Sequence, residues 1–157
     1  MRKKYLLFVS MIMLTACSLF SNHSDLTFHE AEKAGYVVSG PGGLSGIRKL
    51  EEFHQNVQNK LKSQVSIAQY TDEGDPIYTD LDFNGEAIKY TYDNSWDAFG
   101  GQGKGVRTAT CKAIIKRTGP YGEANGTVYL LSQCNRDIGY SDPDRKEYFL
   151  LFVPQMQ

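Results

Sequence analysis

The hydrophobic periodicity of the chain changes near residue 63, and this change constrains the fold more than any other feature. Before it, apolar side chains recur at three- and four-residue steps, which predicts an amphipathic helix over residues 45–62. That stripe consists of Ile47, Leu50, Phe53, Val57 and Leu61. Beyond residue 63, apolar and polar residues alternate, as they do in strands. Helical sequence followed by strands predicts an α+β domain, with an N-terminal helix or helices packed on a mainly antiparallel sheet of about five to six strands.

The ends of the helices are also marked in the sequence. Residues 28–34 predict a shorter first helix that ends at Gly35, because glycine favours the residue after a helix. For the longer helix, Ser45 is the expected N-cap. Lys60 and Lys62 are expected in its last turn, where the helix dipole favours cations.

The predicted strands follow one another at short intervals. Asn84-Gly85 predicts a hairpin after the strand at residues 77–83, because both residues tolerate positive φ. Residues 106–118 predict one long strand that pairs with residues 127–134. Residues 148–153 are apolar on both faces, a pattern typical of a central, covered strand.

The N-terminus has the layout of a secretory signal peptide, with three basic residues, an apolar run of about ten residues and small residues after it. The run is shorter than the roughly 17 residues that a membrane-spanning helix needs. Leu14-Thr15-Ala16-Cys17 resembles the lipobox of bacterial lipoproteins, in which the cysteine receives a diacylglyceryl group and becomes the first residue. An ordinary signal peptide with an incidental cysteine is the alternative. From this motif we expect Cys17 to be lipidated, and we expect the protein to stay on the membrane because a diacylglyceryl group supplies two acyl chains, which give stable attachment.

This interpretation divides the chain into a signal peptide at residues 1–16, a lipidated cysteine with its tether at 17–27, and one globular domain at 28–157. The removed segment carries three of the 17 basic residues and none of the 18 acidic ones, so the mature net charge is −4 with His neutral. A mildly acidic domain lacks the basic surface that nucleic-acid binding requires. Because the signal peptide directs export and Cys17 carries the lipid, we expect the domain on the extracytoplasmic face of the cell membrane.

Two cysteines remain once Cys17 carries lipid. Cys111 and Cys134 fall nearly opposite each other if residues 106–118 and 127–134 form a hairpin. An even pair in an exported protein predicts a disulfide, and a pair of free thiols is the alternative. A metal site is not expected, because no His partners stand at metal-site spacing.

A glycine-rich loop is the candidate binding element: Gly101, Gln102, Gly103, Lys104 and Gly105. A phosphate-binding P-loop would need Ser or Thr after the lysine, and Gly105 stands there. Recognition residues concentrate on loops, so a binding role remains open.

Acidic residues offer the other chemical possibilities. Asp80-x-Asp82-x-Asn84-Gly85 matches the start of a calcium loop, but Thr91 occupies the position of the required glutamate, so the hairpin interpretation is favoured. The acids that a hydrolase could use are Asp72, Glu73, Asp75, Asp80 and Asp82. No nucleophile motif accompanies them, so no catalytic residue and no cofactor are expected.

Several aromatic residues are not readily assigned to the core from the alternation alone. They are Tyr70, Tyr78, Tyr121, Tyr140 and Trp96. Exposed Tyr and Trp are typical of binding faces. Ordinary packing between neighbouring strands is the simpler interpretation.

Four strings carry a resemblance to a known family: EAEKAGYVV at residues 30–38, LEEF at 50–53, EGDPI at 73–77 and KYTYDN at 89–94. Over about residues 28–153 the chain resembles small lipoproteins of spore-forming Gram-positive bacteria, catalogued as a domain of unknown function, number 4362. The resemblance implies a lipidated, single-domain exported protein on the outer face of the cytoplasmic membrane. It implies no reaction, ligand or functional residue.

The sequence thus favours a membrane-anchored, exported lipoprotein with a non-enzymatic binding or accessory domain. Its partners would be the membrane, through the lipid on Cys17, and an unidentified envelope protein. Two alternatives remain open. One is a small envelope hydrolase that uses the acids above, and the other is an inhibitor or immunity-type module that presents the loop at residues 100–105 to an enzyme.

Overall fold

The structure is a computed structural model, and it describes residues 23–155. The predicted lipidation site, Cys17, lies outside the described residues. In chain order the elements are α1 (Phe28–Ala34), β1 (Val37–Gly40), β2 (Gly43–Ser45), α2 (Ile47–Gln58), β3 (Ser63–Tyr70), β4 (Pro76–Phe83), β5 (Ile88–Asp93), the short 3-10 helix η1 (Gly101–Gly103), β6 (Val106–Cys111), β7 (Ala113–Tyr121), β8 (Ala124–Ser132) and β9 (Tyr148–Pro154).

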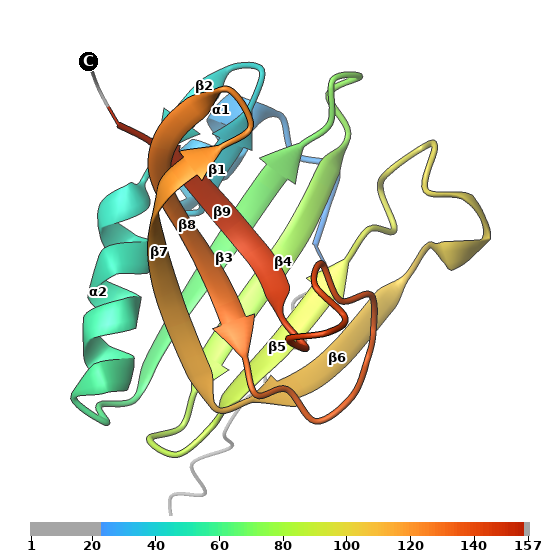
Figure 1. The fold of residues 1–157 in the computed structure, drawn as a ribbon. Coiled ribbons are helices and arrows are strands. Elements are labelled where there is room, and N and C mark those ends of the chain that lie inside the picture. Colours follow the sequence, from blue (N-terminus) through green and yellow to red (C-terminus); the bar gives the residue numbers. More distant parts are fainter. Residues whose placement is uncertain (1–22, 156–157) are drawn as a thin grey trace, which may run out of the picture.

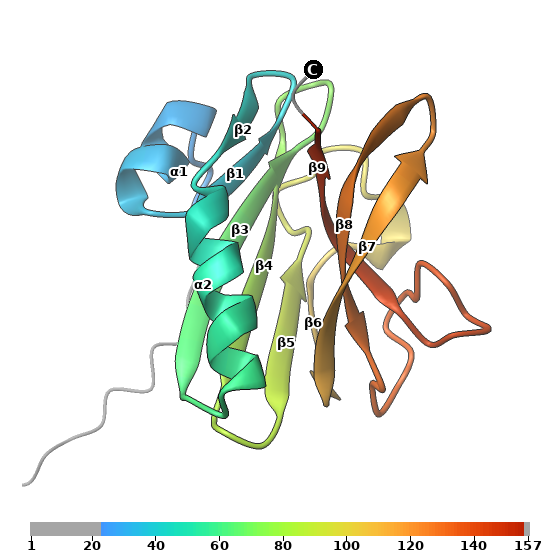
Figure 2. The ribbon, with the colours of Figure 1, turned by 60° about the vertical axis from the view of Figure 1, so that its left-hand side comes forward.

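The predicted α+β class is confirmed, with the strands divided between two sheets. The larger sheet is mixed and has the order β2-β1-β3-β4-β5-β6, in which only β1 and β3 run parallel. The smaller one is antiparallel, with the order β7-β8-β9. Helix α2 and the smaller sheet cover one face of the larger sheet, and α1 lies against the other face (Figures 1 and 2).

The single long strand predicted over residues 106–118 is wrong. It is interrupted at Lys112, where the chain passes from β6 in one sheet to β7 in the other. Ile114 is consequently buried, whereas its neighbours Ala113 and Ile115 are only half-buried. The alternation of apolar and polar residues in the sequence continues through Lys112 and does not mark the break. The change of sheet is therefore a consequence of packing on the core.

The two faces of the larger sheet have separate apolar clusters, because neighbouring residues in a strand point to opposite faces. Val37 and Ile67 face α2 and the smaller sheet, where Phe53 and Leu131 also lie. On the other face a small cluster surrounds Tyr78 beneath α1. The larger cluster is therefore the main core of the domain.

Helix α1 has the predicted bounds. Thr27 and Glu30 form a reciprocal capping box, and Gly35 ends the helix with φ of 95°. The predictions at the ends of α2 are wrong. Gly46 is the N-cap, and the hydroxyl of Ser45 instead donates to the Glu32 carboxylate at 2.6 Å. Because α2 ends at Gln58, Lys60 and Lys62 lie beyond its last turn.

Strand β9 is an edge strand, so its predicted central position is wrong. Its pairing with β8 shifts between Tyr129 and Leu130, and this irregularity lets both Leu150 and Leu151 point into the core. On its outer face, Phe149 and Phe152 stack with the ring of Tyr121. The apolar character of both faces therefore comes from the bulge and from the aromatic cover.

The predicted disulfide is present in the structure. Cys111 ends β6 and Cys134 follows β8, and their Cα atoms are 4.0 Å apart. The backbone of Asn135 donates to the carbonyl of Thr110 beside the bridge. The disulfide therefore joins the edge of the larger sheet to the smaller sheet at the point where the chain turns from one to the other.

Candidate functional site

Three aromatic side chains fasten the segment that precedes α1. The hydroxyl of Tyr78 donates to the carbonyl of Ser24 at 2.7 Å, and that of Tyr70 donates to the carbonyl of Leu26 at 2.7 Å. The indole of Trp96 donates to the carbonyl of His23 at 3.1 Å. Residues 23–26 were expected in a flexible tether. They lie instead against the larger sheet, so residues 23–26 belong to the folded domain.

His23 is the centre of this fastening. Its side chain is only 2 % exposed, and its ring stacks on Tyr78 with a centroid distance of 4.2 Å. Its Nε2 lies 2.9 Å from Asp80, and its Nδ1 lies 3.2 Å from the hydroxyl of Tyr36. The sequence placed His23 in the tether, and its role was missed because its partners are far away along the chain.

The cluster around Asp80 differs from a hydrolytic triad in the order of its groups. The hydroxyl of Ser66 donates to Asp80 at 2.6 Å, so one carboxylate joins Ser66 and His23. A hydrolytic triad places the histidine between the nucleophile and the acid, and here the acid stands between the other two. Burial raises the pKa of both Tyr70 and Tyr78, which keeps their hydroxyls protonated as donors to the segment.

The predicted binding loop belongs to a larger feature, which we call the aromatic loop (residues 94–105). Its two ends are joined by Asn94, whose backbone donates to the carbonyl of Gly105 and whose side-chain oxygen accepts from the Gly105 amide at 3.0 Å. Between them, the amide of Ala98 donates to Asp75 at 2.7 Å. The loop is therefore held at its base and in its middle, and it projects from the edge of the molecule (Figure 1).

The aromatic loop exposes large apolar side chains. Phe99 is 77 % exposed and Trp96 is 40 % exposed, and Val106 is exposed immediately after the loop. The sequence prediction named Gly101 to Gly105, which form η1 and the return of the loop, but it missed Phe99. The available signal was an aromatic residue directly before consecutive glycines. A turn made of glycines has few side chains for the ring to pack against, so the ring is exposed.

The carboxylates proposed for a hydrolase are dispersed. Asp72 and Glu73 are exposed in a turn, and Asp82 is exposed on the outer face of β4. Asp75 holds the aromatic loop, and Asp80 holds His23. None of the three pockets described for the molecule is lined by any of these acids.

The hairpin interpretation of residues 80–85 is confirmed. The side-chain oxygen of Asn84 accepts from the amides of Glu86 and Ala87, both at 2.9 Å, and Gly85 has φ of 103°. Asn84 is thus committed to its own turn. Among residues 23–155, no group of three or more His, Cys, Asp or Glu side chains is placed to hold a metal ion.

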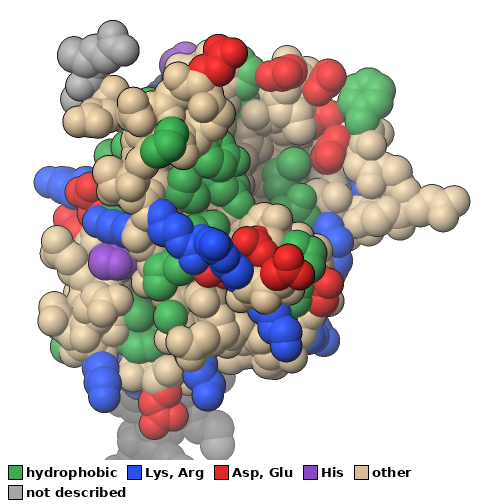
Figure 3. All heavy atoms as spheres, in the orientation of Figure 1, with side chains coloured by type: hydrophobic (Ala, Val, Ile, Leu, Met, Phe, Trp, Pro, Cys, Tyr) green, Lys and Arg blue, Asp and Glu red, His purple; other side chains and the backbone are tan. Residues whose placement is uncertain are grey.

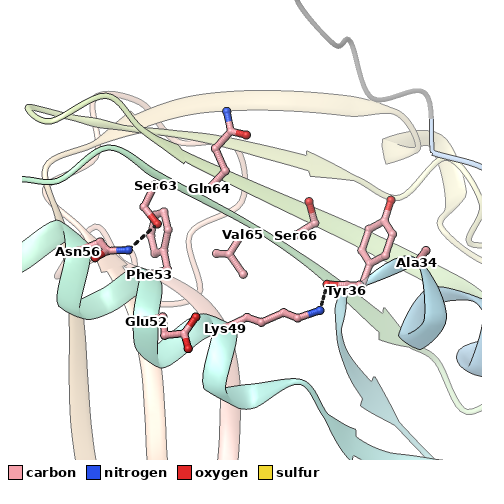
Figure 4. Close-up of a pocket in the computed structure, with 11 residues that line it drawn as sticks. Ala34, Tyr36, Lys49, Glu52, Phe53, Asn56, Ser63, Gln64, Val65 and Ser66 are labelled. Atoms are coloured by element: carbon pink, nitrogen blue, oxygen red, sulfur yellow. Dashed lines mark hydrogen bonds between the residues drawn. The ribbon is translucent and has the colours of Figure 1, made fainter.

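A groove of about 370 Å³ lies between α2 and the start of β3, and we call it the edge groove (Figure 4). Its wall on the α2 side comes from Lys49, Glu52, Phe53 and Asn56, and its floor comes from Ser63 to Ser66. At one end, Asn56 donates to the hydroxyl of Ser63 at 3.1 Å. At the other, the ammonium of Lys49 donates to the carbonyl of Gly35 at 2.5 Å.

A second pocket, of about 430 Å³, lies on the outer face of the smaller sheet. Arg117 donates two hydrogen bonds to Glu147, at 2.7 and 2.5 Å, and the side chain of Glu147 is only 4 % exposed. Tyr121 and Phe149 form its apolar part. Figure 3 shows hydrophobic side chains gathered over β8 and β9 on this face, with charged side chains beside them.

Comparison of the chain with known protein families identifies the family to which it belongs. The family described as Domain of unknown function (DUF4362) matches residues 34–129, well over half of the chain. The chain belongs to this family. No curated protein and no solved structure matches the chain. The DUF4362 region runs from the last residue of α1 into β8, so it contains the whole edge groove and the whole aromatic loop. It contains Cys111 but ends before Cys134 and β9.

Within residues 23–155, no helix is long and apolar enough to span a membrane.

Proposed function

We propose that the chain is an exported lipoprotein, anchored to the cell membrane through Cys17, whose domain binds an envelope protein through the aromatic loop. The observation that carries the binding role is the exposure of Phe99 at 77 % on a loop that Asn94 and Asp75 hold in place. An apolar side chain presented on a restrained loop loses little conformational entropy when it enters a pocket. This favours a recognition element over a catalytic one.

The position of the aromatic loop relative to the anchor supports the proposal. Only five residues separate Cys17 from His23, so this stretch spans at most about 20 Å when fully extended. Trp96 of the loop donates to the carbonyl of His23 itself. The lipid and the loop would therefore be close together, which suits a partner that is itself in or on the membrane.

Charge narrows the class of partner. Asp72 and Glu73 are exposed in the turn that Asp75 joins to the loop, and the predicted mature chain is acidic. Anionic lipid headgroups would be repelled by this surface. We therefore propose a protein partner with an apolar pocket and a basic rim. An inhibitor or immunity-type module is the second candidate function, since the same restrained and projecting loop suits insertion into an enzyme's cleft.

The anchor is tested by Cys17→Ala in the full-length chain. We expect the variant to incorporate no radiolabelled fatty acid and to leave the membrane fraction or remain as uncleaved precursor, because the thiol is the acceptor of the lipid. The matched control is Cys134→Ala, which should still be labelled. Fatty-acid labelling of Cys17→Ala at the wild-type level would refute the anchor.

A further inference from the structure

The edge of the larger sheet has a step at β3. Strand β1 pairs with Ile67, Ala68 and Gln69 only. On the other side, β4 pairs with every residue from Ser63 to Tyr70. Residues 63–66 therefore have a strand on one side alone. Unpaired amide and carbonyl groups along a strand edge are a template on which another extended chain can pair.

Another free edge of the same sheet is covered by the protein itself. At β6, Thr110 exchanges hydrogen bonds with Asn135, and the guanidinium of Arg136 donates to the carbonyl of Thr108 at 2.5 Å. At residues 63–66, no strand from residues 23–155 pairs on the side away from β4, and none of the hydrogen bonds from described turns, loops and caps reaches their backbone. This stretch also lacks the usual protection of an edge, since Ser63-Gln64-Val65-Ser66 contains no proline, charge or bulge.

The uncovered edge is the floor of the edge groove rather than an open surface. Helix α2 forms one wall, and the contacts of Asn56 with Ser63 and of Lys49 with Gly35 close its two ends (Figure 4). Four residues of strand extend about 13 Å. The groove thus has the length of a short strand and offers a series of backbone groups along it, with polar side chains above them.

We infer that the edge groove binds an extended peptide segment of a partner protein, which adds to β3 as a further strand. Backbone hydrogen bonds to residues 63–66 supply the affinity in this mode of recognition, and side-chain pockets supply the specificity. The groove is lined by Lys49, Glu52 and Asn56, so it favours polar or small side chains on the bound segment. A peptide fits better than a compact small molecule, because the unpaired groups lie in a row. This site is separate from the aromatic loop.

Hydrogen exchange of the full-length, lipidated protein in detergent micelles gives the first test. In the free protein, amides of residues 63–66 that point away from β4 should exchange as fast as amides of exposed turns, while those of Ile67 to Gln69 should be protected. Protection along 63–66 in the free protein would mean that the chain covers this edge itself, for example with the residues before His23. That outcome would overturn the inference.

Peptide binding gives the second test, with an array of random eight-residue peptides as the probe. A bound peptide should slow exchange at residues 63–66. N-methylation of its alternate backbone nitrogens should weaken binding by at least about tenfold in one register only, because each methyl group removes a hydrogen-bond donor. Equal tolerance of N-methylation at every position, or the absence of any binding peptide, would contradict strand addition.

Two variants of α2 provide a matched pair. Glu52→Arg places a longer side chain of opposite charge over the groove and should weaken peptide binding by about tenfold. Glu51→Arg makes the same change of charge at the next position, which does not line the groove, and should leave binding unchanged. Equal effects of the two variants would argue against the groove. Phe99→Ala should not affect peptide binding, so failure of this inference can be told apart from failure of the proposed function.

Discussion

Replacing Cys111 and Cys134 together by alanine is expected to lower the free energy of unfolding by about 3 kcal/mol. The bridge closes a loop with a sequence separation of 23 residues, and removing it restores that freedom to the unfolded chain. Both cysteines are buried, so the substitution also leaves small gaps in the core. Because the bridge joins the two sheets, backbone amides of the smaller sheet should lose more protection from hydrogen exchange than those of the larger sheet.

Urea unfolding followed by circular dichroism measures this effect. The wild-type protein under reducing conditions should resemble the double variant, whereas reduction should not change the double variant further. Ser132→Ala, at the neighbouring end of β8, is the control and should retain nearly all of the stability. A loss below about 1 kcal/mol in the double variant would show that the cross-link constrains the unfolded chain much less than its loop length predicts.

Phe53→Ala is expected to have the largest effect of any single substitution proposed, about 4 kcal/mol of lost stability. Phe53 is 1 % exposed on the inner face of α2, within the cluster that joins α2 to both sheets. Truncation removes an aromatic ring from the centre of this cluster and leaves a cavity. The same urea experiment measures the change in the midpoint of unfolding.

Leu61→Ala is the matched control for Phe53→Ala. Leu61 belongs to the same predicted stripe, but it lies beyond the end of α2 and is 56 % exposed. Its truncation should change stability by no more than about 0.5 kcal/mol. A large effect at Leu61 together with a small one at Phe53 would show that the packing of α2 differs from that described.

The features that could be predicted from the sequence depend on neighbouring residues. The bounds of α1 follow from Thr27, Glu30 and Gly35, all within a few residues of one another. The hairpin at Asn84 and the opposition of Cys111 and Cys134 also follow from short-range spacing. By contrast, nothing at Lys112 marks the passage between sheets, because the alternation is continuous there and the break depends on the core.

The candidate sites show the same limit. The glycines of the aromatic loop were evident, but the fastening of His23 depends on Asp80 and Trp96, which are 57 and 73 positions away. The sequence did not explain the positions of Tyr70, Tyr78 and Trp96. Their side chains donate to backbone carbonyls of residues 23–26, the segment before α1, which lies far away along the chain. The edge groove could not be predicted, since it exists only because β1 pairs with part of β3.

Photo-crosslinking in living cells tests the proposed binding role most directly. A photoreactive phenylalanine analogue is placed at Phe99 in the full-length chain, and separately at Tyr121, an exposed aromatic residue on the smaller sheet. We expect one dominant envelope protein crosslinked from position 99, little from position 121, and loss of the adduct in Cys17→Ala. No adduct from position 99, or the same adducts from both positions, would contradict the proposed binding role.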